Sequence, residues 1–179
     1  LELHQLEMRY EALRKRNPRH ERTLIASLLE VGQQLPIVVV AAGEQRFVVI
    51  DGYKRVRALR QLCRDTVRAM VWAVGEEDAL LLEQLMRAAG PDALEQGWLL
   101  AELQARFGLS TEALSRRCDK STSWVSRRLG LVKELPSSIQ AQVRQGQIAA
   151  HAAMKYLVPL ARANAKAAKR LAEGLGSWR

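Results

Sequence analysis

The chain has 179 residues, 48% of them hydrophobic, and its 28 lysines and arginines outnumber its 19 aspartates and glutamates. The formal net charge of +9 is typical of a protein that faces a polyanion, with nucleic acid as the first candidate and an anionic membrane surface as the second. The two cysteines and three histidines are too scattered for a zinc site, and no run of about 18 apolar residues is present that would span a membrane.

The first 75 residues predict a mixture of helices and strands. Two short β-branched runs flank a turn at Gly43, which indicates a hairpin. Apolar residues recur at helical spacing at the start of the chain, at Leu3, Leu6, Tyr10 and Leu13. In chain order, the predicted elements are a partly amphipathic opening over 1–16, a helix over 21–31, strands over 35–40 and 47–50, a helix that ends near residue 62, and a strand over 67–74.

The rest of the chain predicts helices alone. Turn residues such as Gly90-Pro91 and Gly108 separate the helical segments, and Asp92 with Glu95 forms a capping-box pattern at the start of one of them. The helices are expected over 76–89, 92–107, 111–118, 121–132, 136–145, 149–158 and 160–173.

The composition changes near residues 75–91, which indicates two parts. We therefore expect the α+β class, with a small mixed α/β domain followed by an all-α domain. The mixed domain is expected over 1–75, a connecting helix and boundary over 76–91, and the helical domain over 92–179.

A helix-turn-helix is predicted over residues 111–132. Asp119-Lys120 forms the turn, Ser121 is a good N-cap, and the inward side is apolar, with Leu109, Leu114, Cys118, Val125, Leu129 and Val132. In this geometry the start of the second helix meets base edges in the major groove of double-stranded DNA. The alternative is an ordinary helical hairpin with a basic, solvated face. The predicted DNA-binding residues are Arg116, Arg117, Lys120, Ser121, Thr122, Ser123, Ser126, Arg127 and Arg128.

A second basic cluster lies where a predicted strand runs into a helix. The strand ends at Asp51-Gly52, and the helix opens with Lys54, Arg55 and Arg57. A helix N-terminus has a positive potential, so cations there are unfavourable unless an anion binds. The cluster indicates bound phosphates, from a nucleotide or from DNA, and the alternative is a basic helix face without a ligand.

These segments resemble the ParB family of chromosome and plasmid partition proteins from about residue 17 to residue 160. The family pattern G-E-R-R-x-R-A is similar to Gly52-Tyr53-Lys54-Arg55-Val56-Arg57-Ala58. A G-x-x-Q-P-type segment precedes it, here Gly32-Gln33-Gln34-Leu35-Pro36-Ile37, and the family's E-N-x-x-R follows as Glu83-Gln84-Leu85-Met86-Arg87. The helix-turn-helix then comes in the family order.

The resemblance implies CTP with Mg²⁺ in the N-terminal domain and a palindromic DNA site on the helix-turn-helix. It also implies a dimer that CTP closes into a clamp sliding along DNA, and a ParA-type Walker ATPase as a partner. By this resemblance, Glu83 helps to place Mg²⁺ and Arg87 supports the phosphates or the closed interface. The triphosphate is held by Gly52, Lys54, Arg55 and Arg57.

The sequence departs from the family pattern at two positions. Tyr53 replaces a Glu that is associated with nucleotide turnover, and Gln84 replaces the Asn beside the metal-binding Glu. We therefore expect nucleotide binding with at most weak CTP hydrolysis, and DNA binding as the main activity. The chain begins with Leu1 and ends soon after Trp178, so we expect either a trimmed fragment without the family's dimerisation domain or weakened dimer formation.

Two other functions stay open at this point. One is a DNA-binding transcriptional regulator on the same fold that has lost nucleotide binding and contacts DNA phosphates with its second basic cluster. The other is a nucleotide-using enzyme or nuclease, against which stands the lack of a nucleophile beside a base or of paired metal carboxylates. In each case we expect a cytoplasmic, nucleoid-associated protein without a membrane partner, with Cys63 and Cys118 as buried free thiols.

Overall fold

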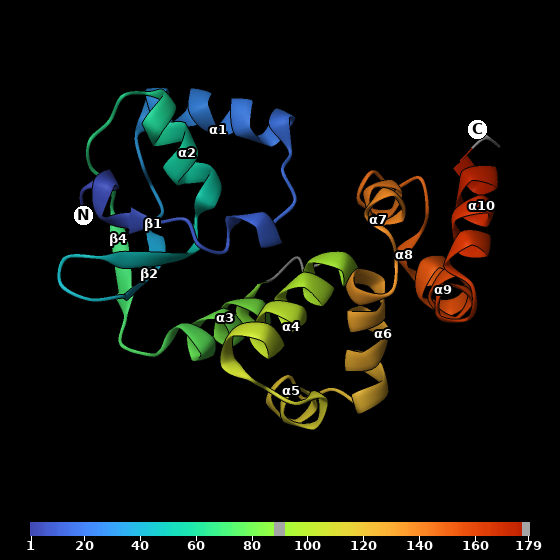
Figure 1. The fold of residues 1–179 in the computed structure, drawn as a ribbon. Coiled ribbons are helices and arrows are strands. Elements are labelled where there is room, and N and C mark those ends of the chain that lie inside the picture. The colour runs from blue at the N-terminus through green and yellow to red at the C-terminus, as the bar shows by residue number, and fades with distance from the viewer. Residues whose placement is uncertain (88–91, 177–179) are drawn as a thin grey trace. The chain divides into compact units, whose positions relative to one another are not determined.

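The computed structural model describes residues 1–87 and 92–176, which belong to two compact units (Figure 1). The first unit spans Leu1–Arg87 and combines helices with a sheet, whereas every regular element described in the second, Ala88–Arg179, is helical. The predicted α+β class, a small mixed domain followed by an all-helical one, is confirmed. None of the helices in the described ranges is long and apolar enough to cross a membrane.

The first unit is built on a four-stranded sheet. Its elements are η1 (Leu3–Gln5), β1 (Leu6–Glu7), η2 (Glu11–Leu13), α1 (Pro18–Val31), β2 (Ile37–Ala41), β3 (Phe47–Asp51), α2 (Tyr53–Gln61), β4 (Ala69–Trp72) and α3 (Glu76–Met86). The strand order is β1-β3-β2-β4, with β2 and β3 antiparallel and the two edge strands parallel to their neighbours. The predicted hairpin is therefore confirmed, and β3 lies inside the sheet.

The core of the first unit covers both faces of β3. Val48, Val49 and Ile50 are consecutive, and all three side chains are fully buried. α1 and α2 lie next to each other on one side of the sheet, and α3, from the segment predicted as a connection, packs against β3 (Figure 1). Because β3 is packed on both faces, its carboxyl end fixes the position of the start of α2.

The start of the chain does not follow its helical spacing. Leu6 and Glu7 form β1 and pair with Phe47 and Val48 of β3, and the flanking residues make only 3-10 turns. A helix there would leave the backbone groups at that edge of β3 without these strand partners. Strand pairing and burial therefore outweigh the helical spacing noted over residues 1–16.

The second unit is a set of helices around an apolar cluster. Its elements are α4 (Ala93–Phe107), α5 (Thr111–Arg117), α6 (Thr122–Lys133), α7 (Ser137–Arg144), α8 (Ala150–Ala152), η3 (Ala153–Leu157), α9 (Val158–Ala163) and α10 (Ala165–Gly176). α6 packs against both α4 and α5, and α9 packs against α10. The buried cluster comprises Leu94, Leu131, Leu135, Ile139, Val143, Ile148, Ala153, Leu157, Val158, Ala168 and Ala172.

The helix boundary predicted near Pro159 lies five residues further along the chain, at Asn164, where the backbone is extended. α8, η3 and α9 form one continuous helical segment over 150–163. η3 is a π-helical turn that ends at Leu157, two residues before Pro159, whose nitrogen has no hydrogen to donate. The local change of register lets the helix pass the proline, so the two helices predicted over 149–158 and 160–173 have the wrong boundary.

The two cysteines differ in exposure. Cys118 is buried, as predicted, and burial raises the pKa of its thiol. Cys63 is exposed, contrary to the prediction. It follows the end of α2 in a left-handed conformation with a φ of 50°, which takes it off the helix face that its apolar neighbours occupy.

We expect Cys63 alone to react with iodoacetamide in the folded protein at neutral pH. The thiolate is the reactive form, and Cys118 combines a raised pKa with a buried sulfur. Mass spectrometry of the intact protein should show one added group before denaturation and both cysteines modified afterwards. In the control variant Cys63→Ser, rapid modification of Cys118 in the folded state would contradict its buried position.

Candidate functional site

α5 and α6 are short helices joined by a tight turn. The Trp124 amide donates to the Ser121 hydroxyl oxygen at 3.1 Å, which caps the start of α6. The Lys120 amide donates to the Ser115 carbonyl at 3.0 Å, and the Ser115 hydroxyl donates to the Lys120 carbonyl at 2.6 Å. The predicted helix-turn-helix and its N-cap Ser121 are therefore confirmed, and the turn is held from both sides.

The two helices separate apolar from polar side chains. Leu114, Cys118, Val125 and Leu129 are buried. α6 has no acidic residue in its first turn. Of the predicted DNA-binding residues, Arg117 is half-buried, and those exposed to solvent are Arg116, Lys120, Ser121, Thr122, Ser123, Ser126 and Arg127. We call the exposed members from Lys120 to Arg127 the α6 surface.

Arg128 lies apart from the α6 surface. Its guanidinium stacks over the Trp124 ring at 3.8 Å from the centroid, and its Nε donates to the Gln96 side-chain oxygen of α4 at 2.6 Å. Burial, with the charge of Arg127 beside it, lowers the Arg128 pKa to about 10. The sequence grouped Arg127 and Arg128 together, but the structure points only Arg127 at solvent and uses Arg128 to hold α6 against α4.

α2 begins at Gly52, directly after β3. The φ of Gly52 is 101°, and a Cβ atom there would lie 2.5 Å from Cγ2 of Ile37, so glycine alone fits. Lys54 follows on the first turn, half-buried, and within the described part of the chain it has no hydrogen bond or ion pair. The helix start therefore offers Lys54 to an anion without a competing partner.

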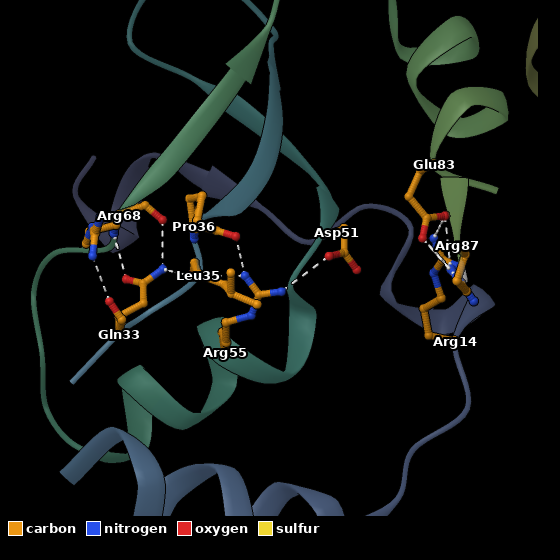
Figure 2. Close-up of polar contacts among 9 residues, drawn as sticks. All are labelled: Arg14, Gln33, Leu35, Pro36, Asp51, Arg55, Arg68, Glu83 and Arg87. Atoms are coloured by element: carbon orange, nitrogen blue, oxygen red, sulfur yellow. Dashed lines mark hydrogen bonds and ion pairs between the residues drawn. The ribbon is translucent and has the colours of Figure 1, made fainter. Parts of the chain in front are cut away.

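The neighbouring Arg55 is engaged by the chain itself (Figure 2). Its guanidinium donates to the carbonyl of Leu35 at 3.1 Å, to the carbonyl of Pro36, and to a carboxylate oxygen of Asp51 at 3.3 Å. These contacts hold the segment before β2 against the start of α2. Arg55 therefore stabilises the fold at the position where the family pattern predicts a phosphate contact.

Arg57 is held by two carboxylates that no sequence motif indicated. One terminal nitrogen donates to Glu11 at 2.5 Å and the other donates to Glu21, across 46 and 36 residues of sequence. Arg16 also donates to Glu11, at 3.0 Å. Burial would raise the pKa of the Glu11 carboxyl, but the hydrogen bonds from Arg16 and Arg57 outweigh burial and hold that pKa below its usual value.

Glu83 and Arg87 lie together on α3 and at its end (Figure 2). The Arg87 guanidinium donates to Glu83 at 2.7–2.9 Å, and Arg14 donates to the second carboxylate oxygen at 2.5 Å. Glu83 is buried, and both of its oxygens face guanidinium groups, so the carboxylate does not fit a magnesium ion in this arrangement. Among residues 1–87 and 92–176, no three His, Cys, Asp or Glu side chains gather as a metal site.

Tyr53, at the position of a family glutamate, points into the core. Its side chain is buried, and its hydroxyl donates to the Val49 carbonyl at 2.6 Å. Burial raises the pKa of the phenol, so it stays neutral. The tyrosine therefore places no carboxylate on the first turn of α2, where Lys54 and Arg55 lie.

Comparisons with known proteins agree with this division into two units. Two family models match the chain, the ParB N-terminal domain over residues 1–85 and the ParB HTH domain over 91–175. A probable chromosome-partitioning protein ParB of Pseudomonas putida is 32% identical over 143 residues, 78% of this chain and 49% of that protein. A nucleoid occlusion protein of Geobacillus kaustophilus is 31% identical over 116 residues, 63% of this chain and 41% of that protein. The chain thus spans about half the length of the curated relatives it matches.

Solved structures share the fold. The C-terminally truncated chromosome-partitioning protein ParB from Caulobacter crescentus, complexed to the centromeric parS site, has a TM-score of 0.52 at 24% sequence identity. The match covers 97% of this chain and 90% of that one.

Proposed function

This chain belongs to the ParB family, and from that premise we propose that it binds a specific site on double-stranded DNA through α5 and α6. The exposed start of α6 carries the proposal. Ser121, Thr122 and Ser123 offer short hydroxyl groups to solvent, while the opposite side of the helix is buried. Short polar side chains at the start of a recognition helix approach base edges closely, and Arg127 on the next turn reaches a base or a phosphate.

A palindromic site follows from this proposal. One helix pair covers one half-site, so a second copy of the chain is needed for the other half. Such a dimer on DNA would act as a partition factor of a chromosome, plasmid or mobile element at the nucleoid, with a ParA-type ATPase as its partner.

Selection of duplexes from a random pool tests the proposal. We expect the retained duplexes to share an inverted repeat, and footprinting should show protection of both half-sites. Affinity should fall as salt rises, because binding releases counterions from the phosphates. Equal retention of all duplexes would mean that the α6 surface binds DNA without sequence specificity, and it would overturn the proposal.

The second candidate is a CTP-responsive clamp on the same fold, with the triphosphate bound at the start of α2. Lys54 favours it, because this lysine lies on the first turn of α2, after the N-cap Gly52, and has no partner in the described residues. Arg55, Arg57 and Arg87 would join after leaving their present partners. With Tyr53 buried in place of the glutamate, we propose binding with weak hydrolysis.

The alternative is a transcriptional regulator that has lost nucleotide binding. The paired state of Glu83 with Arg14 and Arg87 favours it, because that carboxylate does not accept a metal while it is so paired. In that case Lys54 would contact DNA phosphate.

Lys54→Ala separates the two candidates. If the clamp proposal holds, the variant should lose CTP binding in calorimetry and keep the salt dependence of duplex binding. If Lys54 contacts DNA, the slope of log affinity against log salt should become shallower by about one. The exposed Lys169 of α10 provides the matched control, Lys169→Ala, which removes the same charge from a helix of the second unit. Absence of CTP binding by the unmodified chain would contradict the clamp proposal.

A further inference from the structure

We infer that Glu11 and Glu21 set the ligand selectivity of the α2 site by competing with the phosphate ligand for Arg57. The α2 site means Gly52, Lys54, Arg55 and Arg57. The inference rests on the proposed phosphate binding at this site, and it concerns which phosphate ligands are accepted.

The geometry shows that Arg57 already has anionic partners. Its side chain is 15% exposed, and those of Glu11 and Glu21 are 26% and 21% exposed, so all three groups are largely withdrawn from water. Each carboxylate takes a different terminal nitrogen of the guanidinium. Each terminal nitrogen therefore already donates to a carboxylate, and a phosphate that takes either of these two hydrogen bonds must displace one carboxylate.

The third guanidinium nitrogen of Arg57 does not change this conclusion. Its Nε is buried and has no hydrogen-bond partner in the described residues. A buried donor without an acceptor is unfavourable, so the guanidinium is not ideally satisfied by its two carboxylates. The present pairing therefore leaves one guanidinium nitrogen unsatisfied, which lowers the cost of exchanging a carboxylate for a phosphate.

The carboxylates come from elements other than α2. Glu11 lies in η2 and Glu21 in the first turn of α1, on either side of the short segment that joins these elements. Glu11 keeps a second partner, Arg16, when Arg57 lets go of it. The released carboxylate is thus not left unpaired, which lowers the cost of exchange.

The negative charge of a ligand determines whether it can replace the two carboxylates at Arg57. Two carboxylates bring two negative charges to Arg57, and a terminal monophosphate brings about the same, roughly −1.5 to −2. A monophosphate therefore gains little by replacing them. A triphosphate carries further charge and spans further along the helix, where Lys54 lies three residues before Arg57 on the same face and is unpaired in the described residues. The competing carboxylates should therefore reject single phosphates and admit chains.

Calorimetry with inorganic tripolyphosphate, CTP and CMP tests this selectivity. The variant Glu11→Gln/Glu21→Gln keeps the shapes of both side chains and removes their charges. We expect it to bind tripolyphosphate about tenfold more tightly than the unmodified chain, the scale of one charged hydrogen bond. It should bind CMP with a larger gain, so that the ratio of CTP to CMP affinity falls.

Glu30→Gln is the matched control, since Glu30 is an exposed carboxylate of the same helix α1. It should change affinity for all ligands by less than twofold and leave the ratio unchanged. If the double variant is unfolded by circular dichroism, Glu21→Gln alone should still lower the ratio. In the unmodified chain, hydrogen exchange over residues 11–21 should speed up when tripolyphosphate is added.

The outcomes separate this inference from the proposed function. Phosphate binding with a CTP to CMP ratio that is the same in all variants would overturn the selectivity role alone. An equal gain in Glu30→Gln would do the same, because it would show a general charge effect. No binding of any phosphate ligand by any variant would overturn the α2 site itself and the inference with it.

Discussion

Arg127→Ala is expected to weaken binding of the selected duplex by about 1–3 kcal/mol, roughly 5- to 150-fold, if the side chain meets a base edge. Arg127 is an exposed cation of α6, one turn after the exposed Ser123. Since its side chain is exposed, its loss should leave the fold intact. Titration of labelled duplexes that differ at single positions measures both affinity and specificity, and one position should become tolerant of substitution.

Two further variants are needed to interpret the effect of Arg127→Ala on binding. Lys169→Ala removes one exposed charge from α10 and should cost less, equally on every duplex. Arg128→Ala acts by another route: it removes the stacking on Trp124 and the hydrogen bond to Gln96, so we expect lower stability together with weaker binding. If Arg127→Ala binds as tightly as the unmodified chain, the α6 surface does not face DNA.

Gly97→Ala should destabilise the second unit by about 1–3 kcal/mol, the usual range for overpacking a tight contact. A Cβ atom at Gly97 would lie 2.5 Å from the Arg128 carbonyl oxygen and 3.1 Å from Cγ1 of Val132. The first of these atoms is backbone, so α4 and α6 must move apart. Because α6 carries the proposed DNA-binding surface, duplex affinity should fall as well. Urea unfolding of the full chain, followed by tryptophan fluorescence from Trp98 and Trp124, measures the loss.

Gly174→Ala is the matched control for this substitution. Gly174 also lies in a helix, α10, and an added Cβ there meets no atom within 4 Å. Alanine is the better helix former by up to about 1 kcal/mol, so this variant should be as stable as the unmodified chain or more so. If Gly97→Ala shows the same gain, the close approach of α4 and α6 is wrong.

Local sequence patterns predicted most of the elements. The β-branched runs around Gly43 became the β2–β3 hairpin, and Asp92 accepts hydrogen bonds from the amides of Leu94 and Glu95, as a helix-starting residue should. Ser121 likewise caps α6. These features depend on residues a few positions apart, so their chemistry can be predicted from spacing alone.

The proposed phosphate site depends on contacts that local sequence patterns do not predict. The sequence placed Lys54, Arg55 and Arg57 on one short helix, but it did not show that only Lys54 is without a partner in the described residues. The partners of Arg57, Glu11 and Glu21, lie in remote segments. No local spacing predicts a pairing across 46 residues, because it arises when the sheet and α1 pack around α2.

By itself, the sequence determined the class of the fold, the helix-turn-helix and the basic residues of both proposed sites, because periodicity, capping and charge are local properties of the chain. The tertiary structure decided which of these cations are free. It buried Tyr53, turned Arg128 toward α4, and gave Arg57 two carboxylates. The physical reason is that a charge withdrawn from water must find a partner nearby in space, and folding alone determines which residue that is.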